Sequence, residues 1–116
     1  MSFTAVKDEE RGDLYFTQSI PFTIERFYYI LPVKDINRGF HRHKETRQAL
    51  FCLSGSCEVH CDNGQSKQNF KIVPGEILIL EPEDWHFMFN YGDDTIIGVF
   101  ASKTYDKEDY IDERYE

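Results

Sequence analysis

The sequence predicts an all-β fold, a sandwich or barrel formed by one domain over residues 1–116. Short runs of aromatic and β-branched residues recur at intervals of about 8–12 residues with turn signals between them, which is the pattern of antiparallel strands in such folds. No long stretch combines helical spacing of apolar residues with capping residues. A chain of 116 residues can bury one core but is too short for two domains.

Local patterns predict each strand in turn. Residues 22–31 form an aromatic-rich run, residues 49–53 form an apolar run that ends at a Ser-Gly turn, and residues 57–62 alternate between apolar and polar. Asn63 and Gly64 come next and give the strongest hairpin signal in the chain. Further strands are expected over 70–73, 77–80, 87–91 and 95–101, and the acidic tail over 105–116 is expected as a helical turn or an extended arm.

The composition excludes several classes of protein. The chain has 13 Lys and Arg against 21 Asp and Glu, a net charge of −8, and a phosphate backbone needs a basic face, so nucleic acid is not expected as a partner. An aromatic content of 16% argues against disorder. No apolar run has the roughly 20 residues that cross a bilayer, and residues 1–13 contain no signal-peptide core. We therefore expect a cytoplasmic protein without a membrane segment.

The cysteines predict packing rather than chemistry. Cys52, Cys57 and Cys61 make an odd count without CxxC spacing, so no disulfide framework is expected. On a strand, Cys57 and Cys61 share a face while His60 points to the other, so these three residues cannot close on one metal ion. We expect the cysteines to pack inside the barrel.

The sharpest chemical signal is a pair of histidines, His41 and His43, within the run RGFHRHK. On a strand, alternate residues point to one face about 6.5–7 Å apart, so the two imidazoles would lie side by side, with Arg42 and Lys44 facing the other way. Such a pair can ligate a metal or transfer protons near neutral pH. The alternative is an edge strand with one exposed and one hydrogen-bonded histidine.

The residues that follow this pair strengthen the prediction of a site. After the two histidines, Gln48 and Gly55 stand at the spacing of the first cupin motif, and Pro82, His86 and Asn90 resemble the second. This resemblance implies a cupin jelly-roll barrel, a double-stranded β-helix, followed by the short acidic tail.

A metal site is a second interpretation of these residues. His41, His43 and His86 could form a three-histidine set for zinc, iron or nickel. The cupin motif has a metal-binding Glu where this chain has the neutral Gln48, and Glu45 could replace it only if the histidine strand continues straight. We therefore expect no metal.

Stretches over residues 11–111 resemble the WxcM-like cupin sugar 3,4-ketoisomerases. The specific part is the combination of RGxHxHK at 38–44 with YDxxDYI at 105–111. The supporting stretches are RGDL at 11–14, IPF at 20–22, LSGSC at 53–57 and WH at 85–86.

The resemblance implies an isomerase without metal or cofactor that moves the ketone of dTDP-4-keto-6-deoxy-D-glucose from C4 to C3. A partner enzyme would then transaminate the 3-keto product to a 3-amino-3,6-dideoxyhexose for surface glycans such as lipopolysaccharide. Homodimers are usual in this family. Its catalytic pair is the two histidines of RGxHxHK, here His41 and His43.

The chemistry of the shift agrees with these residues. C3 must lose a proton, C4 must gain one, and a proton must pass between the two oxygens of an enediol, which needs bases with a pKa near 7. We assign His43 to the carbon and His41 to the oxygens, with the reverse order as the alternative, and Tyr28 as a third relay. Arg26 and Arg38 could stabilise the enediolate or clamp the diphosphate.

The remaining predicted substrate ligands are Arg11, Gln48, Trp85 and His86. Arg11 would contribute if the N-terminal strand lines the mouth of the site, and Trp85 would stack on thymine or sugar unless it belongs to the core. His86 could protonate C4 from the face that gives the galacto product. The alternatives to a ketoisomerase are a metal-dependent cupin enzyme and a sugar-nucleotide sensor that binds without turnover.

Overall fold

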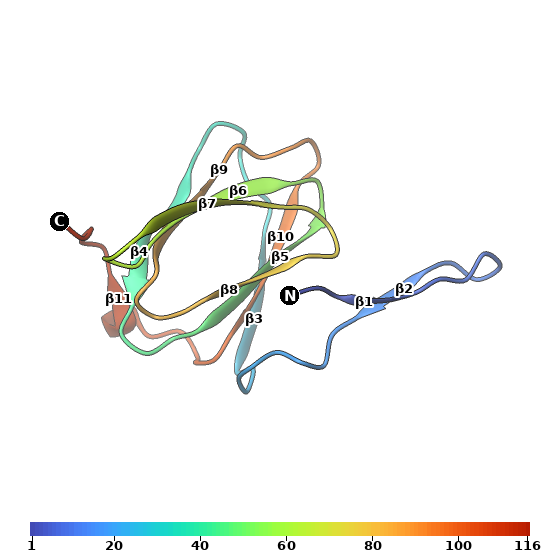
Figure 1. Cartoon of the computed structure of the whole chain (residues 1–116), viewed down its shortest axis with the longest axis horizontal. Coiled ribbons are helices and arrows are strands. Elements are labelled where there is room, and N and C mark those ends of the chain that lie inside the picture. The colour runs from blue at the N-terminus through green and yellow to red at the C-terminus, as the bar shows by residue number, and fades with distance from the viewer.

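Two antiparallel sheets face each other and form a barrel in the computed structural model, which describes residues 1–116 (Figure 1). This confirms the predicted all-β jelly-roll class. The four-stranded sheet has the order β3 (Arg26–Ile30), β10 (Ile96–Ala101), β5 (Gln48–Ser54) and β8 (Ile77–Leu80). The five-stranded sheet has the order β11 (Tyr110–Ile111), β4 (Arg38–His43), β9 (Trp85–Phe89), β6 (Cys57–Asp62) and β7 (Lys67–Ile72).

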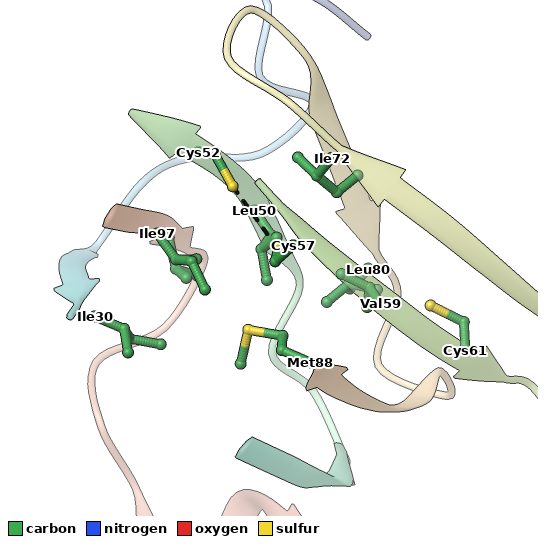
Figure 2. Close-up of a cluster of buried hydrophobic side chains, with 11 residues drawn as sticks. Ile30, Leu50, Cys52, Cys57, Val59, Cys61, Ile72, Leu80, Met88 and Ile97 are labelled. Carbon is green, nitrogen blue, oxygen red and sulfur yellow. Dashed lines mark hydrogen bonds between the residues drawn. The ribbon is translucent and has the colours of Figure 1, made fainter. Parts of the chain in front are cut away.

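The core fills the space between the two sheets (Figure 2). Leu50 and Ile97 enter from the four-stranded sheet, and Val59 and Met88 enter from the five-stranded sheet. The alternation predicted for residues 57–62 is confirmed over 57–61, where β6 buries every second side chain, and Asp62 at the end of the strand is buried as well. The alternating buried side chains are Cys57, Val59 and Cys61.

The hairpin predicted at Asn63 and Gly64 is also confirmed, since it joins β6 to β7. The Asn63 side-chain oxygen accepts hydrogen bonds from the backbone N–H groups of Gln65 and Ser66, both at 2.9 Å. These bonds satisfy the turn locally, as Asn side chains commonly do.

The strand predicted over 22–31 is shorter than expected and begins at Arg26. Glu25 still donates its backbone N–H to the Ala101 carbonyl oxygen of β10 at 2.9 Å, but the residues before it lie over the outer face of the four-stranded sheet without pairing. Phe22 packs there against an apolar cluster centred on Ala49, Phe51 and Ile77. Burial of Phe22 on this face therefore competes with extension of the strand.

The N-terminal residues form an arm outside the barrel. β1 (Thr4–Val6) and β2 (Leu14–Phe16) pair only with each other and project from the barrel on the side away from the C-terminus (Figure 1). Phe3 anchors the base of the arm through an edge contact with Phe51, at 5.1 Å between ring centroids.

The acidic tail contains both structures expected for it, a helical turn and an extended segment. A single 3-10 turn, η1 (Lys107–Asp109), is capped by the Asp106 side chain, and β11 follows and pairs with β4. None of the helical segments is long and apolar enough to cross a membrane.

A β-bulge in β4 sets the register of the predicted histidines. Gly39 and Phe40 have positive φ angles of 110° and 61°, and the pairing with β9 shifts between Gly39 and His41. A Cβ atom on Gly39 would lie 2.9 Å from the His86 carbonyl oxygen, so the strands can approach here only because residue 39 is glycine. The result places His41 directly opposite His86.

Gly55 provides a test of the turn between the two sheets. Its φ is +75°, and an added Cβ would lie 2.6 Å from Thr95 Cα and 2.9 Å from Asp93 O. We expect Gly55→Ala to destabilise the fold by about 2–4 kcal/mol, because it adds a backbone clash to an unfavourable conformation. Gly75 has a φ of +98° with nothing within 4 Å of an added Cβ, so Gly75→Ala should cost only about 1 kcal/mol. Denaturant unfolding measures both, and equal losses would contradict this account of the turn.

Candidate active site

A cavity of about 330 Å³ opens between the two sheets and collects most of the predicted site residues. Its walls come from β3, β4, β5, β9, β10 and β11. The predicted residues that line it are Arg26, Tyr28, Arg38, His41, Gln48 and His86. His43 stands behind this wall, with its ring centroid 5.2 Å from that of His41.

Three imidazoles and a phenol meet at one side of the cavity. The His41 ring centroid lies 5.0 Å from that of His86 and 4.9 Å from that of Tyr110. The His43 ring centroid lies 4.6 Å from that of Tyr110. The prediction that His41 and His43 share a face of one strand therefore agrees with the structure.

Each imidazole is held through its Nδ1 atom. His41 Nδ1 lies 3.0 Å from the Gly39 carbonyl oxygen, and His86 Nδ1 lies 2.9 Å from the Asp84 carbonyl oxygen. Because a carbonyl can only accept, both Nδ1 atoms carry the hydrogen when the rings are neutral. The Nε2 atoms then carry the lone pairs, which is the form needed to accept a proton.

Burial keeps the three imidazoles neutral. It lowers the pKa of His41 and of His43 below the ordinary value of 6.5, and in His41 the nearby His43 lowers it further. Burial lowers the pKa of His86 to about 3. All three rings can therefore act as bases or hydrogen-bond acceptors at neutral pH.

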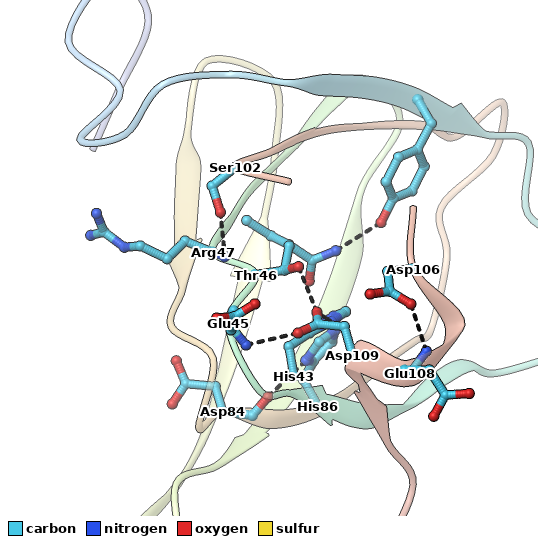
Figure 3. Close-up of polar contacts among 12 residues, drawn as sticks. His43, Glu45, Thr46, Arg47, Asp84, His86, Ser102, Asp106, Glu108 and Asp109 are labelled. Atoms are coloured by element: carbon cyan, nitrogen blue, oxygen red, sulfur yellow. Dashed lines mark hydrogen bonds and ion pairs between the residues drawn. The ribbon is translucent and has the colours of Figure 1, made fainter. Parts of the chain in front are cut away.

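Asp109 of the tail fixes the orientation of His43 (Figure 3). His43 Nδ1 donates to Asp109 Oδ2 at 2.9 Å, and the Thr46 hydroxyl donates to the same oxygen at 2.5 Å. The Glu45 backbone N–H donates to Oδ1 at 2.8 Å. Burial alone would raise the pKa of Asp109, but these three donors lower it below its ordinary value, so the group stays a carboxylate.

Sequence reasoning did not assign a role to Asp109 or Tyr110. Both lie in the YDxxDYI stretch that carried the family resemblance, so the signal was present without a reason for it. The pairing of β11 with β4 supplies that reason, because it sets Tyr110 opposite His43.

Tyr28 and Gln48 form a second polar pair in the cavity. Gln48 Nε2 donates to Tyr28 Oη at 2.8 Å. Burial raises the pKa of Tyr28 to about 12, so the phenol keeps its proton at neutral pH. The Arg26 guanidinium lies over the Tyr28 ring, 5.3 Å from its centroid. This pair therefore offers a neutral hydrogen-bond donor beside a positive charge.

Two predicted ligands lie outside this cavity. Trp85 is 2% exposed and faces the opposite side of β9, where its indole N–H donates to the Asp112 carbonyl oxygen at 3.0 Å. Strand alternation explains this placement, since the adjacent His86 takes the inner face. Arg11 lies on the exposed arm and pairs with Asp8 at 2.6 Å. The structure thus assigns Trp85 to packing, the alternative given above, and places Arg11 away from the cavity of its own chain.

The side chains at the cavity do not fit a metal ion. No group of three or more His, Cys, Asp or Glu side chains is arranged to hold one. The amide of Gln48 stands where a carboxylate would be needed, and its nitrogen already donates to Tyr28.

Comparisons with known proteins agree with this geometry. A family model described as FdtA: WxcM-like, C-terminal matches residues 1–116. The TDP-4-oxo-6-deoxy-alpha-D-glucose-3,4-oxoisomerase of Aneurinibacillus thermoaerophilus is 41% identical over 108 residues, which are 89% of this chain and 78% of that protein.

Two solved structures are similar over almost the whole chain. One is a mutant of the 3,4-ketoisomerase QdtA from Thermoanaerobacterium thermosaccharolyticum in complex with TDP-4-keto-6-deoxyglucose, with 34% identity, a TM-score of 0.89 and coverage of 97% of this chain and 84% of that one. The other is a 3,4-ketoisomerase from Helicobacter canadensis, with 34% identity, a TM-score of 0.88 and coverage of 97% and 87%. The chain therefore belongs to the FdtA, WxcM-like family, as its sequence motifs predicted.

Proposed function

We propose that this protein is a sugar-nucleotide 3,4-ketoisomerase that converts dTDP-4-keto-6-deoxy-D-glucose to the 3-keto isomer. The observation that carries the proposal is the gathering of neutral imidazoles, a protonated phenol and two arginines around one cavity. The names of the relatives support the substrate, since they act on or bind TDP-4-keto-6-deoxyglucose. A transaminase would use the 3-keto product to make a 3-amino-3,6-dideoxysugar.

The proposed reaction is a set of proton transfers. His43 takes the C3 proton on Nε2, and the electron pair of the C3–H bond forms the C3=C4 double bond of an enediolate. His41, which lines the cavity, moves a proton from the C3 oxygen to the C4 oxygen and so forms the other enediolate. A proton is then delivered to C4, and the C3 oxygen becomes the new carbonyl. No electron leaves the substrate in these steps.

The remaining polar groups would stabilise the charge that develops. The Tyr28 O–H is a donor for the oxygen that becomes negative, and Arg26 and Arg38 supply positive charge in the cavity. Donors aimed at a developing oxyanion often contribute about 10²–10³ in rate. One of the arginines can bind the diphosphate instead, because a guanidinium matches its geometry.

We also propose a homodimer. The arm leaves the apolar side chains Val6, Leu14 and Tyr15 about half exposed or more, at 46%, 58% and 52%. A second copy of the chain would cover them, and Arg11, on the same arm, could contact substrate only in such an assembly. Light scattering tests this, and a particle of 13.7 kDa would contradict it. A cytoplasmic location stays a prediction.

Proton NMR of the purified protein with dTDP-4-keto-6-deoxyglucose in heavy water tests the function. We expect the C3 proton signal to disappear and a 3-keto sugar deuterated at C4 to form, with or without chelator. His41→Asn and His43→Asn should each lower kcat by at least about 10²-fold, the usual contribution of an acid or base. His60→Asn, on the outer face of β6, is the matched control and should leave the rate unchanged.

Each other result of that experiment favours a different function. Activity that chelator abolishes would favour a metal-dependent cupin enzyme. An unchanged spectrum over hours with bound nucleotide sugar would favour a sensor, and binding would then survive His41→Asn and His43→Asn.

The configuration at C4 tests the role of His86. Its ring lies in the cavity wall beside His41, and we propose that its Nε2 takes up a proton from water and passes it to C4 from the face that gives the galacto product, while His43 loses the C3 proton to water. The C4 coupling constant in the same NMR spectrum measures the configuration. We expect His86→Arg to change the product to the other C4 epimer. A galacto product from that variant would remove this role.

Asp109→Asn should remove the charged contact between the tail and His43. The carboxylate raises the pKa of His43, so its loss should lower that pKa. Because His43 must be neutral to accept a proton, the acidic loss of kcat/KM should then occur at lower pH than in the wild type. The kcat should fall about 10²-fold, since the amide no longer fixes the tautomer of His43.

Glu108→Gln is the control, because it removes the same charge from an exposed neighbour in the tail. The pH dependence of kcat/KM and the melting temperature of both variants check the prediction. A wild-type pH profile for Asp109→Asn would contradict it.

A further inference from the structure

Only one half of the Gln48 carboxamide has a partner. Its Nε2 donates to Tyr28 Oη at 2.8 Å, whereas its Oε1 is buried with no hydrogen-bond partner. The side chain is 3% exposed, so water does not compensate freely. A buried acceptor without a hydrogen-bond partner destabilises the protein. Such an oxygen at the wall of an active site is expected to gain a partner during the reaction.

A second unpartnered atom belongs to His43, which stands behind this wall, and a third is Arg26 Nε in the wall itself. The His43 Nδ1 is held by Asp109, and its Nε2 is buried without a partner. The Gln48 side chain raises the pKa of His43 and lowers that of Tyr28, and its Oε1 and the His43 Nε2 are both buried without a partner. A protonated Nε2 can donate to the amide oxygen, whereas a neutral Nε2 offers it only a lone pair.

The other groups that face His43 leave this position to Gln48. Asp109 binds the far nitrogen, one of the remaining groups is a cation without an acceptor, and no hydrogen bond joins Nε2 to any of the other rings. These groups are His41 of β4, His86 of β9, Tyr110 of β11 and Arg26 of β3.

We propose that Gln48 is a positioning residue that couples His43 to Tyr28 during the ketone shift, an inference that rests on the proposed function. When the C3 proton moves to His43 Nε2, the new N–H donates to Gln48 Oε1. At the same time Gln48 Nε2 donates a hydrogen bond to Tyr28 Oη, which uses one of the oxygen's lone pairs. The Tyr28 proton therefore points away from Gln48, toward the substrate oxygen that becomes negative as the C3–H electron pair forms the enediolate.

A carboxylate at this position could not serve both partners. It has no donor for Tyr28, so the phenol would turn its proton toward the carboxylate and away from the substrate. Its charge would also hold the proton on His43 and slow its release. The proposed coupling needs an uncharged side chain that has one donor and one acceptor. This explains why the chain has Gln at position 48, where the cupin motif has Glu.

Two variants of Gln48 should shift His43 in opposite directions. Gln48→Glu places a negative charge beside Nε2 and should raise the pKa of His43, whereas Gln48→Leu removes the acceptor and should lower it. Histidine NMR titration of the substrate-free protein measures this directly. In both variants kcat should fall about 10²-fold with a much smaller change in KM, because a donor that acts in the transition state is lost.

Three features of the design separate this role from a structural one. Chelator is present throughout, so that the new carboxylate cannot recruit a metal. Gln65→Glu makes the same change in the exposed β6–β7 turn and should leave both the His43 titration and kcat unchanged. A general loss of stability would lower the folded fraction without moving the titration of His43 in two directions.

The inference is overturned if His43 titrates as in the wild type in both variants, if both shift it the same way, or if kcat is unchanged. The titration needs no turnover. Opposite shifts in a protein that does not isomerise its substrate would therefore refute the proposed function while the contact between Gln48 and His43 stood.

Discussion

The hydrogen bond between His43 and Asp109 links two residues 66 positions apart and holds the tail on the barrel. A buried carboxylate stays charged only while donors surround it. Asp109 has three such donors, one from β4 and two from the turn after it, at Glu45 and Thr46. The tail, that turn and the end of β4 must therefore fold together, and the orientation of the His43 ring is a consequence of the same contact.

The other two imidazoles are held in the same way, by hydrogen bonds to backbone carbonyl oxygens in place of the carboxylate. His41 and His86 each direct Nδ1 at a carbonyl two residues earlier in the chain. The strand that carries each ring thus also fixes its tautomer. Three rings can lie within 5.0–6.5 Å of one another because burial keeps them uncharged. Charged imidazoles at these distances would repel one another.

Local sequence patterns predicted the structural features that depend on residues close together in the chain. The period of two placed Cys57 and Cys61 in the core and His41 beside His43. It did not reveal the bulge at Phe40, which depends on the close approach of β9 and which aligns His41 with His86. Asp109 could not be predicted from spacing, because its partner is set by how the tail folds back.

The net charge of −8 does not describe the charge of the cavity, because the charged residues are not distributed evenly. Among the residues that line the cavity, the formal charges are those of Arg26 and Arg38, and no carboxylate is present. Of the other basic residues near the histidines, Arg47 is neutralised by Glu81 at 2.7 Å and Arg42 lies against the Tyr115 ring on the outer side. Exposed charges that lie further apart than a Debye length of about 8 Å are largely screened from one another, so distant carboxylates act only weakly on the cavity. An acidic chain can therefore have a cavity whose lining is positively charged and attracts an anionic sugar nucleotide.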